Sequence, residues 1–144
     1  MASKEDLEGR LAVMYVEDEP VNVLMMRALF DYRPMLKLVV ARTGQESVDL
    51  VASCSPALLL LDLHLPDCHG ADLLKQLRLV ESCRHVPAIA VTSDRTFAHR
   101  GSGFCEIWHK PFLLFHTLDR IDKRLLPRRG QTTPPTRRIM LSAA

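Results

Sequence analysis

Five polar residues follow apolar stretches of the sequence, and each carries a group that can hold a metal ion or an anion. Glu17 and Asp18 come after one stretch, Asp62 after another, and Thr92 and Lys110 after two later ones. Three carboxylates close together repel one another unless a cation lies among them. Oxygen ligands with room for water suit a hard ion such as Mg²⁺. Lys110 would add a fixed positive charge that holds an anion at the same place.

The apolar stretches have the length and composition of buried strands, with helical patterns between them. We expect strands at 11–16, 36–41, 57–61, 88–91 and 104–108. Strands that are apolar on both faces and alternate with helices indicate an α/β fold with a parallel sheet covered on both sides. Ligands of such a doubly wound sheet bind beyond the carboxyl ends of its strands. The five polar residues should therefore converge on one rim.

Local signals place the helices between these strands. Proline is tolerated in a first helical turn, so Glu19-Pro20 opens the first helix, and Thr43 with Glu46 has the spacing of a capping box. Further helices are expected from Gly70 and near the carboxyl end. The face of the first helix is predicted to hold Val21, Leu24, Met25, Ala28 and Leu29, and that of the last Leu114, Leu118, Ile121 and Leu125.

Length and composition bound the class of protein. The chain has 144 residues, of which 47% are hydrophobic and 25% charged, as in a globular protein with one domain. No apolar run approaches the roughly 20 residues that a bilayer requires, and the charged start does not resemble a secretory signal. The four cysteines form no CxxC pair, so a zinc site or disulfide framework is not expected. These features predict a cytoplasmic protein without membrane attachment.

Charge divides the chain into unequal parts. We expect an extension at 1–9, a folded domain at 10–126 and a basic, proline-containing, flexible tail at 127–144. The tail holds four arginines and no acid, so without it 15 basic residues face 17 acids, a net charge of −2. The folded part has no basic surplus, which argues against DNA binding by this chain.

In four places the sequence resembles the receiver domain of two-component response regulators, over roughly residues 10–126. The motifs are Tyr15 to Asn22, Leu59 to Gly70, Val91-Thr92-Ser93 and His109-Lys110-Pro111-Phe112. The intervals of 44 residues from Asp18 to Asp62 and 30 from Asp62 to Thr92 match the family's spacing. The opening motif also looks like receivers of hybrid histidine kinases. The resemblance implies a flavodoxin-like (βα)5 three-layer sandwich with strand order 2-1-3-4-5.

The same resemblance assigns roles to the rim residues. Asp62 would accept a phosphoryl group from a histidine kinase or a histidine phosphotransfer protein. Asp18, Asp62 and the backbone carbonyl of His64 would bind Mg²⁺ directly, with Glu17 acting through water, and Mn²⁺ could replace Mg²⁺. Thr92 and Lys110 would hold the phosphoryl oxygens. The chain would phosphorylate itself and lose the group slowly, without being a turnover enzyme, and would then bind a downstream protein or form a homodimer.

Three positions are expected to modulate this chemistry. His64 and Asp94 stand two residues after Asp62 and Thr92, where the family tunes access of water. A charged pair between them would slow hydrolysis and make it depend on pH between about 6 and 7.5. Ile107 occupies the position of the family's switch aromatic, and Trp108 should face the other way.

The fourth helix is also expected to be short, because the segment Thr92 to Gly103 holds only about a dozen residues. These departures keep a second reading open, an adaptor that has the fold but binds partners irrespective of phosphorylation. A third reading, a phosphatase or dehalogenase-like enzyme, needs an acid two residues after the nucleophile, where this chain has His64.

Overall fold

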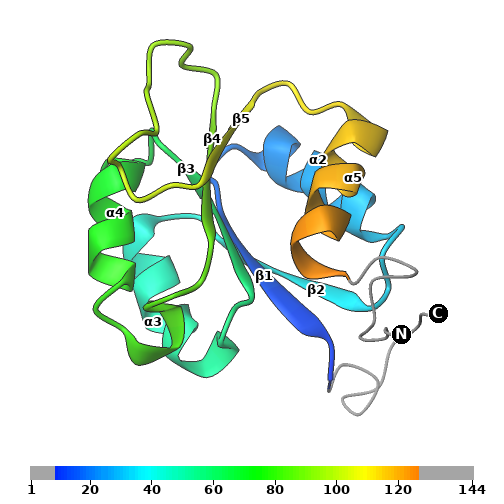
Figure 1. Ribbon diagram of the computed structural model, residues 1–144, viewed down its shortest axis with the longest axis horizontal. Coiled ribbons are helices and arrows are strands. Elements are labelled where there is room, and N and C mark those ends of the chain that lie inside the picture. Colours follow the sequence, from blue (N-terminus) through cyan, green and yellow to red (C-terminus); the bar gives the residue numbers. More distant parts are fainter. Residues whose placement is uncertain (1–8, 127–144) are drawn as a thin grey trace, which may run out of the picture. The chain divides into compact units, whose positions relative to one another are not determined.

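The computed structural model describes residues 9–126. The expectations for 1–8 and for the tail at 127–144 therefore concern residues outside this range. Five parallel strands form one sheet in the order β2-β1-β3-β4-β5, which is the predicted doubly wound order (Figure 1). Their bounds are β1 Leu11–Val16, β2 Leu36–Ala41, β3 Leu58–Asp62, β4 Ala88–Thr92 and β5 Glu106–His109.

Helices cover both faces of this sheet. One face carries α2 (Pro20–Phe30), and the opposite face carries α3 (Gly44–Cys54) and α4 (Gly70–Leu77) (Figure 1). A short 3₁₀ helix, Glu81–Cys83, follows α4. The chain divides into two compact units, and the second, which begins at Leu113, contains α5 (Leu114–Leu125) as the sequence predicts. Within residues 9–126, no helix combines the length and apolar character needed to span a membrane.

The capping box at the start of α3 forms as predicted. The hydroxyl oxygen of Thr43 accepts a hydrogen bond from the Glu46 amide at 3.0 Å, and Glu46 in turn accepts one from the Arg42 amide at 2.6 Å. Asp67, from the loop after β3, adds a second cap by accepting bonds from the amides of Gly44 and Gln45. The loop that follows Asp62 is thereby fixed to α3.

The predicted face of α2 is wrong except at Leu29. The helix buries Val23, Met26, Leu29 and Phe30, whereas Val21 and Leu24 are exposed by 60% and 68%. The helix is apolar around most of its circumference, so two apolar stripes satisfy the helical period and periodicity alone cannot choose between them. The exposed stripe, Val21, Leu24 and Met25, is a surface feature that begins three residues after Asp18.

The connection between β4 and β5 is shortened, as the sequence predicts. In the described part of the chain no helix lies between Thr92 and Glu106, where turns at 95–96 and 100–101 take its place. Strand β5 begins at Glu106, two residues later than expected. Its register pairs Ile107 with Ala90 and Trp108 with Val91. Ile107 packs against the core beneath α3 and α4, and Trp108 faces the other side of the sheet as expected.

Candidate functional site

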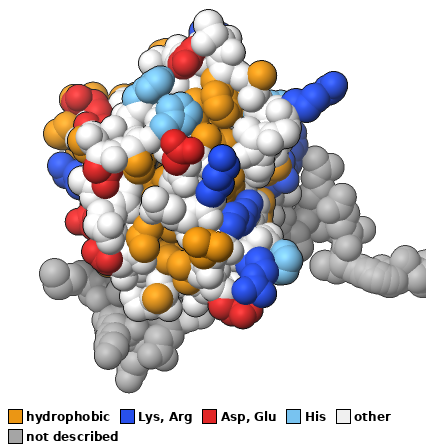
Figure 2. All heavy atoms as spheres, turned by 90° about the vertical axis from the view of Figure 1, so that its left-hand side faces the viewer, with side chains coloured by type: hydrophobic (Ala, Val, Ile, Leu, Met, Phe, Trp, Pro, Cys, Tyr) orange, Lys and Arg blue, Asp and Glu red, His pale blue; other side chains and the backbone are white. Residues whose placement is uncertain are grey.

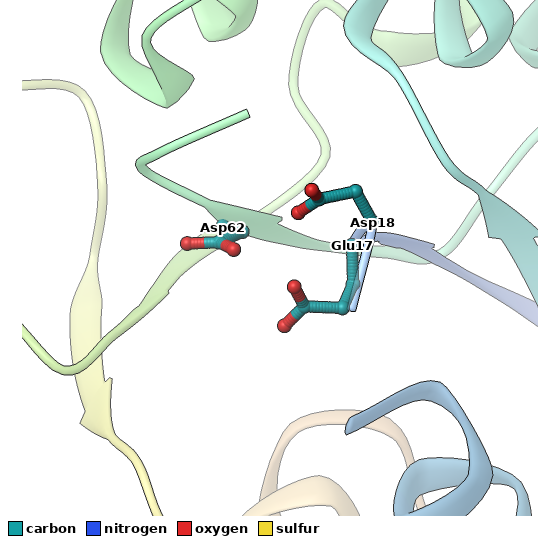
Figure 3. Close-up of side chains that lie close together, drawn as sticks. All are labelled: Glu17, Asp18 and Asp62. Carbon is teal, nitrogen blue, oxygen red and sulfur yellow. The ribbon is translucent and has the colours of Figure 1, made fainter. Parts of the chain in front are cut away.

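Three carboxylates meet at the adjoining ends of β1 and β3 (Figure 3). One oxygen from each of Glu17, Asp18 and Asp62 lies within 4.8 Å of the others. Val16 pairs with Leu61, so the sheet register brings Glu17 level with Asp62. Glu17 and Asp62 are buried, whereas Asp18 is exposed at the mouth of the site. The convergence predicted from the strand ends is therefore present in the fold.

The ammonium group of Lys110 binds two of these carboxylates. Its Nζ lies 2.5 Å from Oε1 of Glu17 and 3.2 Å from Oδ2 of Asp62. Lys110 follows β5, and its peptide bond to Pro111 is cis. Removing one partner from a buried ion pair leaves an uncompensated charge. Lys110 therefore holds the two carboxylates together in a position where their charges would otherwise repel.

The pKa values of this group show the competition between burial and pairing. Burial raises the pKa of Glu17, and nearby Asp62 adds to that effect while Lys110 opposes it. Burial lowers the pKa of Lys110, but its hydrogen bond to Glu17 and the charge of Asp62 outweigh burial and raise the pKa overall. Lys110 is thus a cation across the physiological range, and Glu17 binds a proton more readily than an exposed glutamate.

Tyr15 is a functional neighbour that the sequence analysis missed. Its hydroxyl donates to Oε1 of Glu17 at 3.0 Å inside the core, while the Glu19 amide donates to the other oxygen at 3.3 Å. Burial raises the pKa of Tyr15 far above its usual range, so it remains a donor. A signal existed, because residues two apart on a strand share a face, and Tyr15 therefore had to lie beside Glu17.

The hydroxyl of Thr92 lies at the end of β4 and is buried. Its oxygen accepts a hydrogen bond from the Asp94 amide at 3.0 Å, which leaves the hydroxyl proton available to another acceptor. The carboxylate of Asp94 accepts two bonds from Thr96, and its other oxygen lies 3.7 Å from Nε2 of His64. The hydroxyl and amide of Thr96, followed by His64, lower the pKa of Asp94. The predicted pair of His64 and Asp94 is in place.

The loop from Leu63 to Gly70 fixes the backbone beside Asp62. His64 forms an antiparallel bridge with His69, and the His64 amide donates to Oδ1 of Asp62 at 3.2 Å. The Gly70 amide donates to the Leu63 carbonyl at 2.8 Å. A Cβ on Gly70 would lie 2.9 Å from Cα of Leu63 and closer still to the Asp62 carbonyl. Only glycine permits this approach.

The donor set fits a hard divalent cation. Three carboxylates supply oxygen atoms, and Asp18 is exposed, so water can complete the coordination. A pocket of about 430 Å³ opens beside them and is lined by Asp18, His64 and His69 among others. Lys110 already neutralises part of the negative charge of Glu17 and Asp62. A divalent ion would neutralise the rest.

Comparisons with known proteins agree with this geometry. Residues 13–107 match the response regulator receiver domain family. The polar-differentiation response regulator DivK of Brucella ovis is 35% identical over 103 residues, which cover 67% of this chain and 80% of DivK. The DivK protein of Brucella anthropi is 34% identical over the same length.

Solved structures share the fold at lower identity. The receiver domain of the sensor histidine kinase PA1611 from Pseudomonas aeruginosa has a magnesium ion coordinated in its active-site cleft. It superposes with a TM-score of 0.72 at 23% identity, covering 80% of this chain and 97% of that receiver. The chemotaxis protein CheY4 of Vibrio cholerae gives 0.72 at 17% identity, with 81% and 99% covered.

Proposed function

This chain belongs to the response regulator receiver domain family, and from that membership we propose that Asp62 accepts a phosphoryl group from a histidine kinase or a histidine phosphotransfer protein. The observation that carries the proposal is the position of Asp62. Its Oδ2 lies 3.2 Å from the half-buried ammonium group of Lys110, and one oxygen from each of Asp62, Glu17 and Asp18 lies within 4.8 Å of the others. Family membership gives phosphorylation-based signalling, and this geometry supports Asp62 as the acceptor.

The transfer is a displacement at phosphorus. An oxygen of Asp62 forms a bond to phosphorus while the bond from phosphorus to the donor's imidazole nitrogen breaks, and the imidazole leaves with that electron pair. Lys110 and the hydroxyl of Thr92 hold the phosphoryl oxygens. Glu17, Asp18, Asp62 and the carbonyl of His64 would hold Mg²⁺. When bound, Mg²⁺ supplies positive charge that offsets repulsion between these carboxylates and the phosphoryl group.

The phosphorylated chain acts as a signal. Its surface changes while Asp62 carries the group, and a downstream protein or a second copy of the chain recognises the changed surface. Slow hydrolysis of the acyl phosphate then resets the protein in the cytoplasm. On this proposal the chain undergoes a single modification and is not a dedicated enzyme.

A second function is favoured by one specific observation. The helix between β4 and β5 is replaced by turns, and Ile107 stands where the family's switch aromatic is expected. A receiver that cannot switch would bind its partner whether or not Asp62 is phosphorylated. Such an adaptor keeps the fold and loses the response.

Incubation with acetyl phosphate distinguishes the phosphorylated receiver from the adaptor, because only the receiver needs Asp62 to become phosphorylated. In the presence of Mg²⁺ the intact mass of the protein should rise by one phosphoryl group, and a chelator should prevent the gain. Binding of the downstream partner before and after phosphorylation then tests the signal. A protein that gains no mass under these conditions is an adaptor and not a phosphoacceptor.

A further inference from the structure

Four aromatic side chains form a continuous row that begins beside the candidate site. The rings of His64 and His69 meet edge to face with centroids 5.6 Å apart. The ring of His69 lies 6.1 Å from that of Phe97, and Phe97 lies 6.1 Å from Phe104 in a T-shaped contact. Phe104 is buried in the core beneath α4, while His64 is exposed. The row therefore runs from the rim into the core.

This row joins two segments that are far apart in the sequence. His64 and His69 belong to the loop that follows Asp62, whereas Phe97 and Phe104 belong to the β4–β5 segment, residues 93–104. Asp94 provides a second connection. Its carboxylate contacts His64, and its backbone amide donates a hydrogen bond to the hydroxyl of Thr92. Figure 2, which shows the side of the molecule that carries α4, has histidine side chains next to hydrophobic ones. The β4–β5 segment is thus attached to the site at its beginning and to the core at its end.

Apart from these contacts, the β4–β5 segment is held by hydrogen bonds between near neighbours in sequence, such as those that Ser102 donates to the His99 carbonyl. Turns replace the helix there, and Gly101 and Gly103 adopt φ values of +76° and +92°. A Cβ on Gly103 would lie 3.1 Å from Cδ2 of Leu74, so the backbone passes close to α4 at that point. Residues 98–101 are exposed. Few buried apolar contacts and an open backbone are the features of a segment that changes conformation at low cost.

Ile107 lacks the ring that would carry a signal through β5. Its side chain is aliphatic and packs against the core cluster beside Ala90. The row from His64 to Phe104 passes on the same side of the sheet and reaches Asp62 more directly, because His64 follows Asp62 by two residues and its amide binds that carboxylate. An alternative connection between site and surface therefore exists.

We propose that this row, with Phe97 at its centre, transmits the phosphorylation state of Asp62 to the β4–β5 segment, which becomes the surface that changes. The inference rests on the proposed function. A phosphoryl group brings about −1.5 to −2 charges. It repels the Asp94 carboxylate and offers the His64 imidazole a second anionic partner. The His64–Asp94 contact then breaks, His64 shifts against His69, and Phe97 loses part of its support.

Hydrogen exchange measured by mass spectrometry tests this inference on the full chain. With acetyl phosphate and Mg²⁺ present throughout, phosphorylation should speed amide exchange in 95–103 by about fivefold while the sheet stays protected. In Phe97→Ala, Asp62 should gain its phosphoryl group as in the wild type. The β4–β5 segment should already exchange rapidly without phosphate and change less than about twofold on phosphorylation. Phe115→Ala, the same change at a side chain exposed by 71%, is the control and should respond like the wild type.

The outcomes distinguish this inference from the proposed function. A wild-type protein that gains the phosphoryl group without altered exchange in 95–103 overturns the inference and leaves the function standing. The absence of any mass gain overturns both. If hydrogen exchange in 95–103 responds to phosphorylation in Phe97→Ala as it does in the wild type, the aromatic row does not transmit the signal. Should Phe97→Ala not fold, Asp94→Asn provides the second test, since it removes the repelled charge and should reduce the response by at least about half. A full response in that variant contradicts the inference.

Discussion

Nε2 of His64 lies 3.7 Å from Oδ2 of Asp94, and the two side chains are 62% and 30% exposed. They stand two residues after Asp62 and Thr92 and so face each other across the rim. An exposed pair of this kind contributes little to stability, because solvent screens its electrostatic attraction. Its effect on stability is small, and we expect it to act instead by limiting the access of water to Asp62.

Loss of the His64 side chain, which stands beside Asp62, should shorten the lifetime of the phosphoryl group. In His64→Ala we expect hydrolysis about two- to fivefold faster than in the wild type, because water gains access to the acyl phosphate. The decay of the phosphorylated mass over time gives both rates. The exposed His85→Ala is the control, and identical rates in all three proteins would deny His64 a role.

Removing the hydroxyl of Tyr15 should destabilise the protein. Tyr15→Phe leaves Oε1 of Glu17 with Lys110 alone, and the loss of a buried hydrogen bond to a charged group costs about 1.5–3 kcal/mol. The free energy of unfolding in urea measures the change. Tyr32→Phe alters a side chain exposed by 56% and should shift stability by less than about 0.5 kcal/mol. Equal effects of the two substitutions would show that Tyr15 contributes nothing through Glu17.

Magnesium should raise the melting temperature, and more so as pH increases. Burial and the proximity of Asp62 raise the pKa of Glu17, so the folded protein holds a proton there that Mg²⁺ must displace at low pH. The carboxylate becomes free as pH passes the raised pKa, and stabilisation by Mg²⁺ should therefore grow as the pH rises from the acid range toward neutrality. Thermal unfolding with and without Mg²⁺ measures this. A shift that stays constant or shrinks over that range would contradict the argument.

The same thermal unfolding experiment on Asp18→Asn distinguishes two roles of Asp18, repulsion of the neighbouring carboxylates and stabilisation of the start of α2. If Asp18 repels its neighbours, the variant should melt higher than the wild type without metal and respond less to Mg²⁺. A lower melting temperature without metal would instead show that Asp18 stabilises the start of α2.

The exposed stripe on α2 should bind a protein that donates the phosphoryl group, and it should not affect transfer from a small molecule such as acetyl phosphate. Val21, Leu24 and Met25 lie on one helix face close to Asp18 in sequence, and a partner that delivers phosphate to Asp62 must dock near this end of the sheet. Leu24→Glu should slow transfer from a phosphorylated histidine phosphotransfer protein by about tenfold or more. Its phosphorylation by acetyl phosphate should be unchanged. Leu79→Glu, at a side chain exposed by 82%, is the control, and equal slowing in both variants would argue against docking on α2.

Much of the fold followed from local patterns in the sequence. The strands were predicted within about two residues because each is an apolar run bounded by polar or turn-forming residues. The capping box located α3, and the short interval before Gly103 predicted the shortened connection. The buried stripe of α2 could not be chosen in the same way, since the period of apolar residues fits two faces and only the position of the helix on the sheet decides between them.

The candidate site was also visible in the sequence, because parallel strands end at one edge and bring their last residues together. The contacts that depend on tertiary packing were not visible. Nothing local shows that Asp67 caps α3 across 22 or 23 residues, or that Phe97 reaches His69. The two-residue period of a strand would have placed Tyr15 beside Glu17, but the sequence analysis assigns Tyr15 no such role.

The most direct test of the account compares wild type with Asp62→Asn under identical conditions. Both proteins are incubated with acetyl phosphate and Mg²⁺, and their intact masses are measured alongside circular dichroism spectra that report the fold. The account predicts a gain of one phosphoryl group in the wild type and none in Asp62→Asn, with the same spectrum for both. An equal gain in the folded variant would place the phosphoryl group elsewhere and contradict the assignment of Asp62.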